Sequence, residues 1–160
     1  MIGLISDTHD NIPNINKAVD IFKKKGVSLV IHLGDIVSPG TVLYFHGLNI
    51  KFIQGNCDGD IEWIKQKIQE INGEFLGKFA ELELENKKIA LFHGKQKAKL
   101  NELINSKKYD YVLHGHTHQK RDEKINNTHI INPGSHYLGE EEHTIALLDL
   151  EKDYVEFIKV

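Results

Sequence analysis

Hydrophobic positions along the first half of the chain form short apolar runs that alternate with longer periodic segments. Runs of four to six apolar residues are typical of buried strands, whereas apolar residues that recur every three or four positions are typical of amphipathic helices. The pattern therefore predicts a strand–helix alternation. The predicted strands cover residues 2–6, 28–33 and 50–54, and the predicted helices run from Pro13 to near Gly26 and over 61–72.

The pattern changes after residue 80. Residues 80–92 alternate apolar and charged positions up to an Asn-Lys-Lys turn and are then continuously apolar, which predicts a hairpin with one half-exposed strand. A helix is expected at about 96–107, and the rest is strand-rich. Together the two halves predict an α/β protein with largely parallel central strands and antiparallel additions. The later strands are expected at 109–115, 120–125, 128–132, 143–149 and 153–159.

Composition limits the classes of protein that fit. The 160 residues, 40% hydrophobic and 27% charged, are expected to form one domain over 1–160. A net charge of -3 gives no reason to expect nucleic acid or an anionic membrane as partner, and no apolar run is long enough for a membrane span. The single cysteine, Cys57, favours a reducing cytoplasm. Five lysines between Lys95 and Lys108 are interpreted as a solvated helix face.

Potential metal ligands follow five of the predicted strands, at the carboxyl ends where open α/β sheets bind ligands. A single Asp-x-His is more typical of a turn or a helix cap, but caps do not require histidine, so the joint pattern indicates a metal site. Glycines next to four of these groups would let the backbone approach an ion or phosphate closely. The groups are Asp7 and His9, then Asp35, then Asn56, Cys57 and Asp58, then His93, and finally His116 and His118.

The number and type of these residues predict which metals would bind. Without Cys57 and Asp58 there are seven predicted ligands, which are too many for one tetrahedral site and suit two adjacent divalent ions. Two such ions need a carboxylate or hydroxide between them. The mixed nitrogen and oxygen donors favour transition metals over Ca²⁺. Two ions are therefore expected, with Mn²⁺ first and Ni²⁺, Co²⁺, Fe²⁺ or Zn²⁺ as alternatives.

In this order, the motifs D-x-H, G-D, G-N-x-D, H-G and G-H-x-H, followed by INPGS at 131–135, resemble the calcineurin-like metallophosphoesterases, in particular their small archaeal and bacterial phosphodiesterases. The resemblance implies a four-layer α/β/β/α sandwich of two mixed sheets. It also implies in-line attack on a small phosphodiester, such as a nucleotide-derived one, by a hydroxide between the ions. One ion would be held by Asp7, His9, Asp35 and His118, and the other by the bridging Asp35 with Asn56, His93 and His116.

One departure from the family concerns substrate binding. Cys57 stands where many members have a histidine that steers phosphate or protonates the leaving group, and a thiol is the poorer acid at neutral pH. We therefore expect a preference for esters with good leaving groups. Asn11 is assigned to substrate binding, although a turn role fits it equally well. Asp58 would orient Cys57 or cap the helix near Ile61.

The remaining histidines are expected to have structural roles. His32 is interpreted as a core residue, His114 as a support of the metal ligands, and His136 is left open between site and core. His46, His129 and His143 are expected in turns or at the surface.

The alternative function is a non-catalytic protein-interaction scaffold with a residual metal site, because the fold also resembles that of a retromer subunit that serves as an interaction platform. Metal-dependent hydrolysis would discriminate the two. A homo-oligomer is possible through edge pairing of the exposed strands at 78–86.

Overall fold

Two β-sheets form the centre of the protein, of which a computed structural model describes residues 1–160. The six-stranded sheet has the order β11-β10-β1-β2-β3-β4, and the five-stranded sheet has the order β5-β6-β7-β9-β8. The first sheet consists of β1 (Ile2–Ile5), β2 (Leu29–His32), β3 (Ile50–Phe52), β4 (Glu74–Phe75), β10 (Thr144–Asp149) and β11 (Tyr154–Lys159). The second consists of β5 (Phe79–Leu84), β6 (Lys87–Phe92), β7 (Tyr111–Leu113), β8 (Arg121–Ile125) and β9 (Thr128–Asn132).

Both sheets are mixed. β1 to β4 are parallel in the first sheet, and β6, β7 and β9 are parallel in the second. β10, β11, β5 and β8 add to them in antiparallel pairs. The carboxyl ends of the parallel strands carry the loops that contain the candidate metal ligands.

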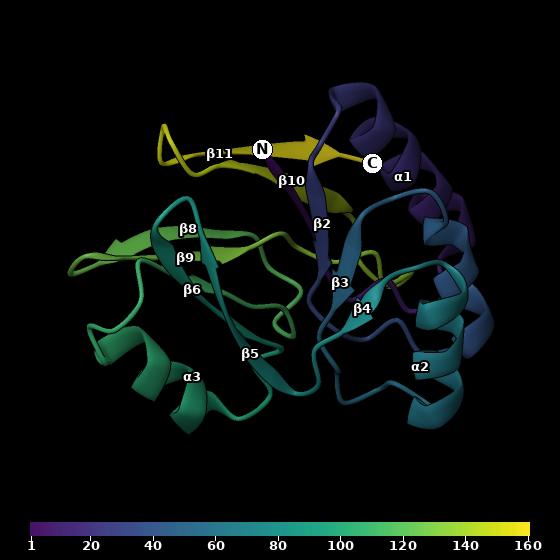
Figure 1. Ribbon diagram of the computed structural model, residues 1–160, viewed down its shortest axis with the longest axis horizontal. Helices are drawn as coiled ribbons and strands as arrows, with labels where there is room; N and C mark the ends of the chain where they lie inside the picture. Colours follow the sequence, from purple (N-terminus) through teal and green to yellow (C-terminus); the bar gives the residue numbers. More distant parts are fainter.

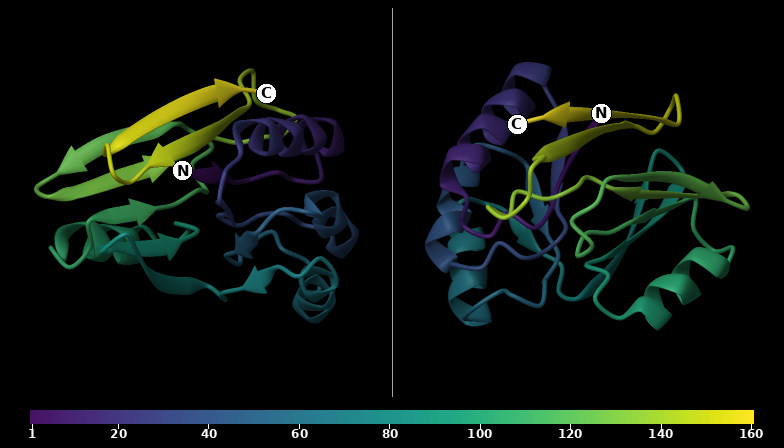
Figure 2. Two further views of the ribbon diagram at one scale, coloured as in Figure 1. Left: turned by 45° about the horizontal axis from the view of Figure 1, so that its top comes forward. Right: turned by 180° about the vertical axis from the view of Figure 1, so that it is seen from behind.

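Helices cover the outer face of each sheet (Figure 1). α1 (Ile12–Lys25), α2 (Ile61–Glu70) and the 3₁₀ helix η1 (Pro39–Phe45) pack against the six-stranded sheet, and α3 (Lys97–Asn105) packs against the five-stranded one. Figure 2 shows the same arrangement from two further sides, with the sheets between the helices. The expected four-layer α/β/β/α sandwich is confirmed.

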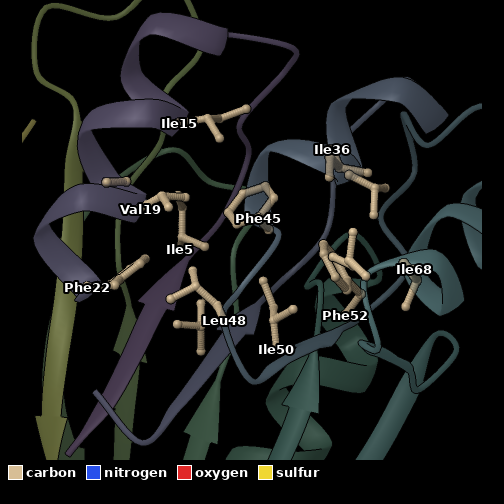
Figure 3. Packing of buried hydrophobic residues seen from close by; sticks show 14 of the residues in the cluster. Ile5, Ile15, Val19, Phe22, Ile36, Phe45, Leu48, Ile50, Phe52 and Ile68 are labelled. Atoms are coloured by element: carbon tan, nitrogen blue, oxygen red, sulfur yellow. The ribbon is translucent and has the colours of Figure 1, made fainter. Parts of the chain in front are cut away.

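Three apolar clusters hold the layers together. Figure 3 shows the one beneath α1 and α2, where Phe22 and Ile68 of the helices meet Ile5, Ile50 and Phe52 of the sheet. A second cluster fills the space between the sheets, and a third lies under α3. The predicted apolar stripe of α1 is fully buried, and the helix ends as predicted, at a glycine in the left-handed region.

Two elements were not predicted. β4 has only two residues, and η1 has irregularly spaced apolar residues, so neither carries a period that a sequence pattern detects. The hairpin turn is also placed differently, because Glu85 and Asn86 form it with positive φ values of 50° and 59°, and Lys87 already belongs to β6.

None of the helices has the length and apolarity that crossing a bilayer requires. β5, which the sequence suggested for pairing between chains, is an edge strand of its sheet and alternates exposed and half-buried residues. Its pairing with a second copy stays a prediction.

Candidate metal centre

The loops after β1, β2, β3, β6 and β7 meet at one edge of the sandwich and bring the candidate ligands together. Their backbone is unusual, because most of these residues have the positive φ that side chains rarely adopt. Such strain persists where surrounding contacts fix it and is concentrated at functional sites. The residues with positive φ are Asp7 (51°), His9 (42°), Asp35 (60°), His116 (69°) and His118 (60°).

Each of the two buried aspartates uses one carboxylate oxygen for structure and leaves the other free. Oδ2 of Asp7 accepts from the Ser6 hydroxyl at 2.5 Å and from the His116 N–H at 2.9 Å. Oδ1 of Asp35 accepts from the Cys57 N–H at 2.8 Å. The remaining oxygens, Oδ1 of Asp7 and Oδ2 of Asp35, face the imidazoles of the site.

Two histidines are oriented by acceptors on their outer nitrogens. Nδ1 of His93 lies 2.8 Å from the Leu33 carbonyl, and Nδ1 of His118 lies 3.1 Å from Oε1 of Glu140. An Nδ1–H that donates to such an acceptor leaves Nε2 with its lone pair, which is the usual arrangement of a histidine that binds a metal.

The inner atoms of the site converge, and three of them are buried without hydrogen-bond partners. Nε2 of His93 lies 3.4 Å from Oδ2 of Asp35 and 4.0 Å from Oδ1 of Asp7, and Nε2 of His118 lies 3.3 Å from the latter oxygen. Oδ1 of Asp7 and Nε2 of His9 and of His93 are buried without any hydrogen-bond partner. Buried polar atoms are rarely left so, and a cation is a partner that carboxylate and imidazole lone pairs share. The donor set therefore fits divalent transition metals.

Three overlapping groups each bring their ligand atoms within 4.8 Å of one another. Because Asp7, His9 and Asp35 each belong to two groups, the arrangement is one continuous cluster. The groups are Asp7–His9–His118, Asp7–Asp35–His93 and His9–Asp35–Cys57.

The electrostatics follow from two buried carboxylates beside imidazoles. Burial opposes ionisation of Asp35, but His93 and the Cys57 N–H outweigh it and hold the pKa of that carboxyl well below its usual range. Asp7 raises the pKa of His118 to about 8. Burial alone would lower the pKa of His93, yet Asp35 and Asp7 raise it. A bound divalent cation would displace these protons, because a ligand imidazole must be neutral.

Two glycines are required by the close approach of backbone to these carboxylates. A Cβ on Gly55 would overlap the carboxylate of Asp35, and a Cβ on Gly115 would overlap Ser6 and Asp7. The sequence pattern associated such glycines with an ion or phosphate, whereas in the structure they make room for the ligand side chains themselves.

The other two predicted ligands lie at the edge of the cluster. His116 is half-buried, its ring centre lies 5.1 Å from that of His93, and burial lowers its pKa. Asn56 is exposed and donates to Sγ of Cys57 at 3.2 Å. Cys57 is also exposed at the surface. Partial burial of its thiol and the nearby carboxylate of Asp35 together raise the pKa of the thiol.

The structure favours the structural alternative for Asn11. This residue is buried, its amide donates to the His136 carbonyl at 2.8 Å, and its Oδ1 accepts from Asn14 N–H as the N-cap of α1. The predicted helix-cap role of Asp58 is wrong, and its role in orienting Cys57 stays a prediction. Its carboxylate accepts from the N–H groups of Ile36, Val37 and Gly55, and Asp60 caps α2 instead.

The remaining histidines fall into two kinds. His32 is buried and satisfied by Thr8 and by the Gly34 N–H, as predicted for a core residue, and His46 is exposed as predicted. His129 was expected at the surface but is 5% exposed, because Asp122 and Asp153 each lie 2.7 Å from one of its ring nitrogens. The others are buried or half-buried near the site: His114, His136 and His143.

Two residues next to the cluster escaped the sequence pattern. Glu140 contacts His118, and Tyr137 packs its ring against His9 at 5.1 Å and against His118 at 5.6 Å. Both lie in the loop between β9 and β10, which carries no ligand motif. The INPGS segment just before it was the one available signal.

Several known proteins are similar to this chain in sequence and in fold. A family model described as the calcineurin-like phosphoesterase superfamily domain matches residues 1–153. A phosphodiesterase of Methanocaldococcus jannaschii is 39% identical over 98% of both chains. The solved structure of an archaeal phosphodiesterase superimposes with a TM-score of 0.94 at 36% identity over 99% of both chains.

More distant structures share the fold. Vps29 of Entamoeba histolytica has a TM-score of 0.71 at 17% identity, over 99% of this chain and 98% of its own. The phosphoesterase YfcE of E. coli has a TM-score of 0.68 at 17% identity, over 98% and 97%. The match of the family model to nearly the whole length, with a relative of high identity, means that the chain belongs to the calcineurin-like phosphoesterase superfamily.

Proposed function

We propose that this protein is a metal-dependent phosphodiesterase that uses two divalent transition-metal ions to hydrolyse small phosphodiesters such as nucleotide-derived ones. The observation that carries the proposal is the pair of buried carboxylates, Asp7 and Asp35, whose inward-facing oxygens lie near the unpartnered Nε2 atoms of His9 and His93. The similarity to two archaeal phosphodiesterases supports diester rather than monoester hydrolysis.

The proposed ligands divide by their position around Asp35. Asp7, His9 and His118 would hold one ion with Asp35, and Asn56, His93 and His116 would hold the other, with Mn²⁺ as the first expectation. Bound divalent ions would lower the pKa of a water molecule and neutralise charge on the phosphoryl oxygens. The chain contributes the orientation: Leu33 and Glu140 fix the imidazoles, and backbone N–H groups fix the carboxylates.

Cys57 is proposed to lie beside the bound phosphoryl group. Its thiol, with its raised pKa, is a poor proton donor at neutral pH, so the chain favours substrates whose leaving group needs no proton. This is consistent with a preference for activated diesters over alkyl monoesters.

The test removes metal from the protein with a chelator and assays bis(p-nitrophenyl) phosphate and p-nitrophenyl phosphate with Mn²⁺, Ni²⁺, Co²⁺, Zn²⁺ and Mg²⁺ added back separately. We expect no hydrolysis without metal and restored hydrolysis, faster on the diester, with at least one transition metal. Metal binding without hydrolysis of either ester would instead favour the scaffold alternative.

A further inference from the structure

The surface around the proposed centre is divided by charge. Three lysines, Lys78, Lys95 and Lys97, lie on the side of His93 and His116, and we call them the lysine flank. On the side of His118, a hollow is lined instead by three successive glutamates, and Lys120 also lines it. The chain as a whole carries a net charge of -3, so the lysine flank is a local feature and not part of a generally basic surface.

Two hollows connect the lysine flank to the proposed ligands. One, of about 260 Å³, is lined by Asn56, His93, Lys78 and Lys95. The other, of about 700 Å³, is lined by His116, Lys95 and Lys97, as well as by Lys120 and Arg121. Lys95 lines both hollows and thus stands between them. A molecule whose phosphorus lies at the metal centre would extend into either hollow past Lys95.

The lysines of the flank have no acidic partners. Lys78, Lys95 and Lys97 form no ion pair, whereas Lys99 and Lys108 of the same sequence stretch pair with Glu102 and Glu81. The lysine stretch between Lys95 and Lys108, interpreted from the sequence as one solvated helix face, thus contains both paired and unpaired lysines.

Few acidic groups oppose the flank from the neighbouring elements. The larger hollow has no acidic side chain in its lining. The smaller has one, Asp58, whose oxygens already accept from three backbone N–H groups. The charges of the flank are thus available to a ligand.

We propose that the preferred substrates are phosphodiesters that carry a second anionic group, such as a nucleotide diester with a further phosphate, and that Lys95 and Lys97 bind that group. The inference rests on the phosphodiesterase activity proposed above. The ammonium group of a lysine acts on phosphate as a point charge, and hydrogen bonds between ionised partners are shorter and stronger than those between neutral groups. The glutamates beside His118 repel the same group, so the substrate is oriented with its second charge toward His116.

Two chromogenic substrates that differ by one phosphate test the proposal. They are thymidine 5′-(p-nitrophenyl phosphate) and the same compound with a 3′-phosphate; both release p-nitrophenolate from the same kind of diester. The readout is the ratio of their kcat/KM values for the metal-loaded protein at low salt. We expect the 3′-phosphorylated compound to be preferred by about tenfold, the size of one charge-assisted contact, with the ratio falling as salt is added.

The variant Lys95→Ala/Lys97→Ala is expected to bring the ratio close to one. Its control is Lys24→Ala/Lys159→Ala, which removes the same charge from exposed positions on α1 and β11 and should keep the wild-type ratio. Inhibition by thymidine 3′,5′-bisphosphate relative to thymidine 5′-phosphate provides a second readout and should change in parallel.

The outcomes separate the two levels of the proposal. Hydrolysis of both compounds at equal kcat/KM by the wild type, or a preference that survives in the Lys95→Ala/Lys97→Ala variant, would overturn the substrate inference while leaving the phosphodiesterase intact. Failure to hydrolyse either compound with any metal would overturn the proposed function itself, and the inference with it.

Discussion

Single side chains beyond the ligands decide how the ligands are held. His118 is oriented by Glu140, an exposed residue in a loop without a motif. Mutation of a residue that orients a metal-binding histidine typically lowers metal affinity by about 10- to 100-fold. We expect Glu140→Gln to weaken metal binding by about tenfold, the lower value because the contact is exposed to solvent. Isothermal titration of the chelated protein measures this. Glu141→Gln, one residue further along the chain, is the matched control, and equal affinities for the two variants would contradict the role of Glu140.

Cys57 is proposed to determine which leaving groups the site accepts. Replacing its poorly acidic thiol by an imidazole supplies a proton donor near neutral pH, and such donors contribute at least about a hundredfold in favourable geometry. We expect Cys57→His to raise the rate on an alkyl phosphomonoester relative to bis(p-nitrophenyl) phosphate by about tenfold or more, while Cys57→Ser does not. An unchanged rate ratio in Cys57→His would remove the explanation.

At the scale of elements, Asp58 connects the loops that follow β2 and β3. It holds the N–H groups of Ile36, Val37 and Gly55 at 2.7, 3.0 and 2.6 Å, and an amide in its place would lose one acceptor and meet an N–H with its own NH₂. We expect Asp58→Asn to lower the free energy of unfolding by about 1–3 kcal/mol, as measured by urea denaturation. Asp60→Asn, which keeps a good N-cap on α2, should change it little; equal losses would argue against the connection.

The elements show what a sequence pattern can predict. β1, β2 and α1 lie within one or two residues of their predicted positions, because burial on a sheet or helix imposes a period on the apolar residues. The candidate metal ligands could be located in the sequence because they directly follow the predicted strands. The left-handed backbone of Asp35 and the hydrogen bond from His118 to Glu140 could not, because they depend on contacts between loops that are distant in sequence.

At the scale of the whole molecule, the two sheets are also joined at a point away from the metal centre. Asp153, in the turn between β10 and β11, contacts Tyr111, Lys124 and His129 of the other sheet. Burial of Asp153 acts against ionisation, but these three contacts hold its pKa well below the ordinary value of 3.8. A carboxylate whose pKa is lower in the folded than in the unfolded state stabilises the fold above its unfolded-state pKa. That contribution is lost as the pH falls from the unfolded-state pKa through the folded-state pKa.

We therefore expect Asp153→Asn to be less stable than the wild type at pH 7, by about 1 kcal/mol or less because the side chain is partly exposed. The difference should shrink as the pH falls from about 4 to about 2, because the carboxylate of the unfolded chain takes up a proton in this range while the folded carboxylate stays ionised. Thermal unfolding at several pH values measures it, with the exposed Asp20→Asn as control. A stability difference that stays constant down to pH 2 would contradict the assignment.

One cluster around Asp7 and Asp35 is proposed to hold the metal that hydrolysis requires. The most direct measurement compares the wild type with Asp35→Asn and His93→Ala in metal content per chain and in hydrolysis of bis(p-nitrophenyl) phosphate, after saturation with Mn²⁺ and with the fold checked by circular dichroism. We expect a loss of bound metal and at least about a hundredfold loss of hydrolysis in both variants. Hydrolysis at the wild-type rate in either folded variant, or undiminished in the presence of a chelator, would contradict it.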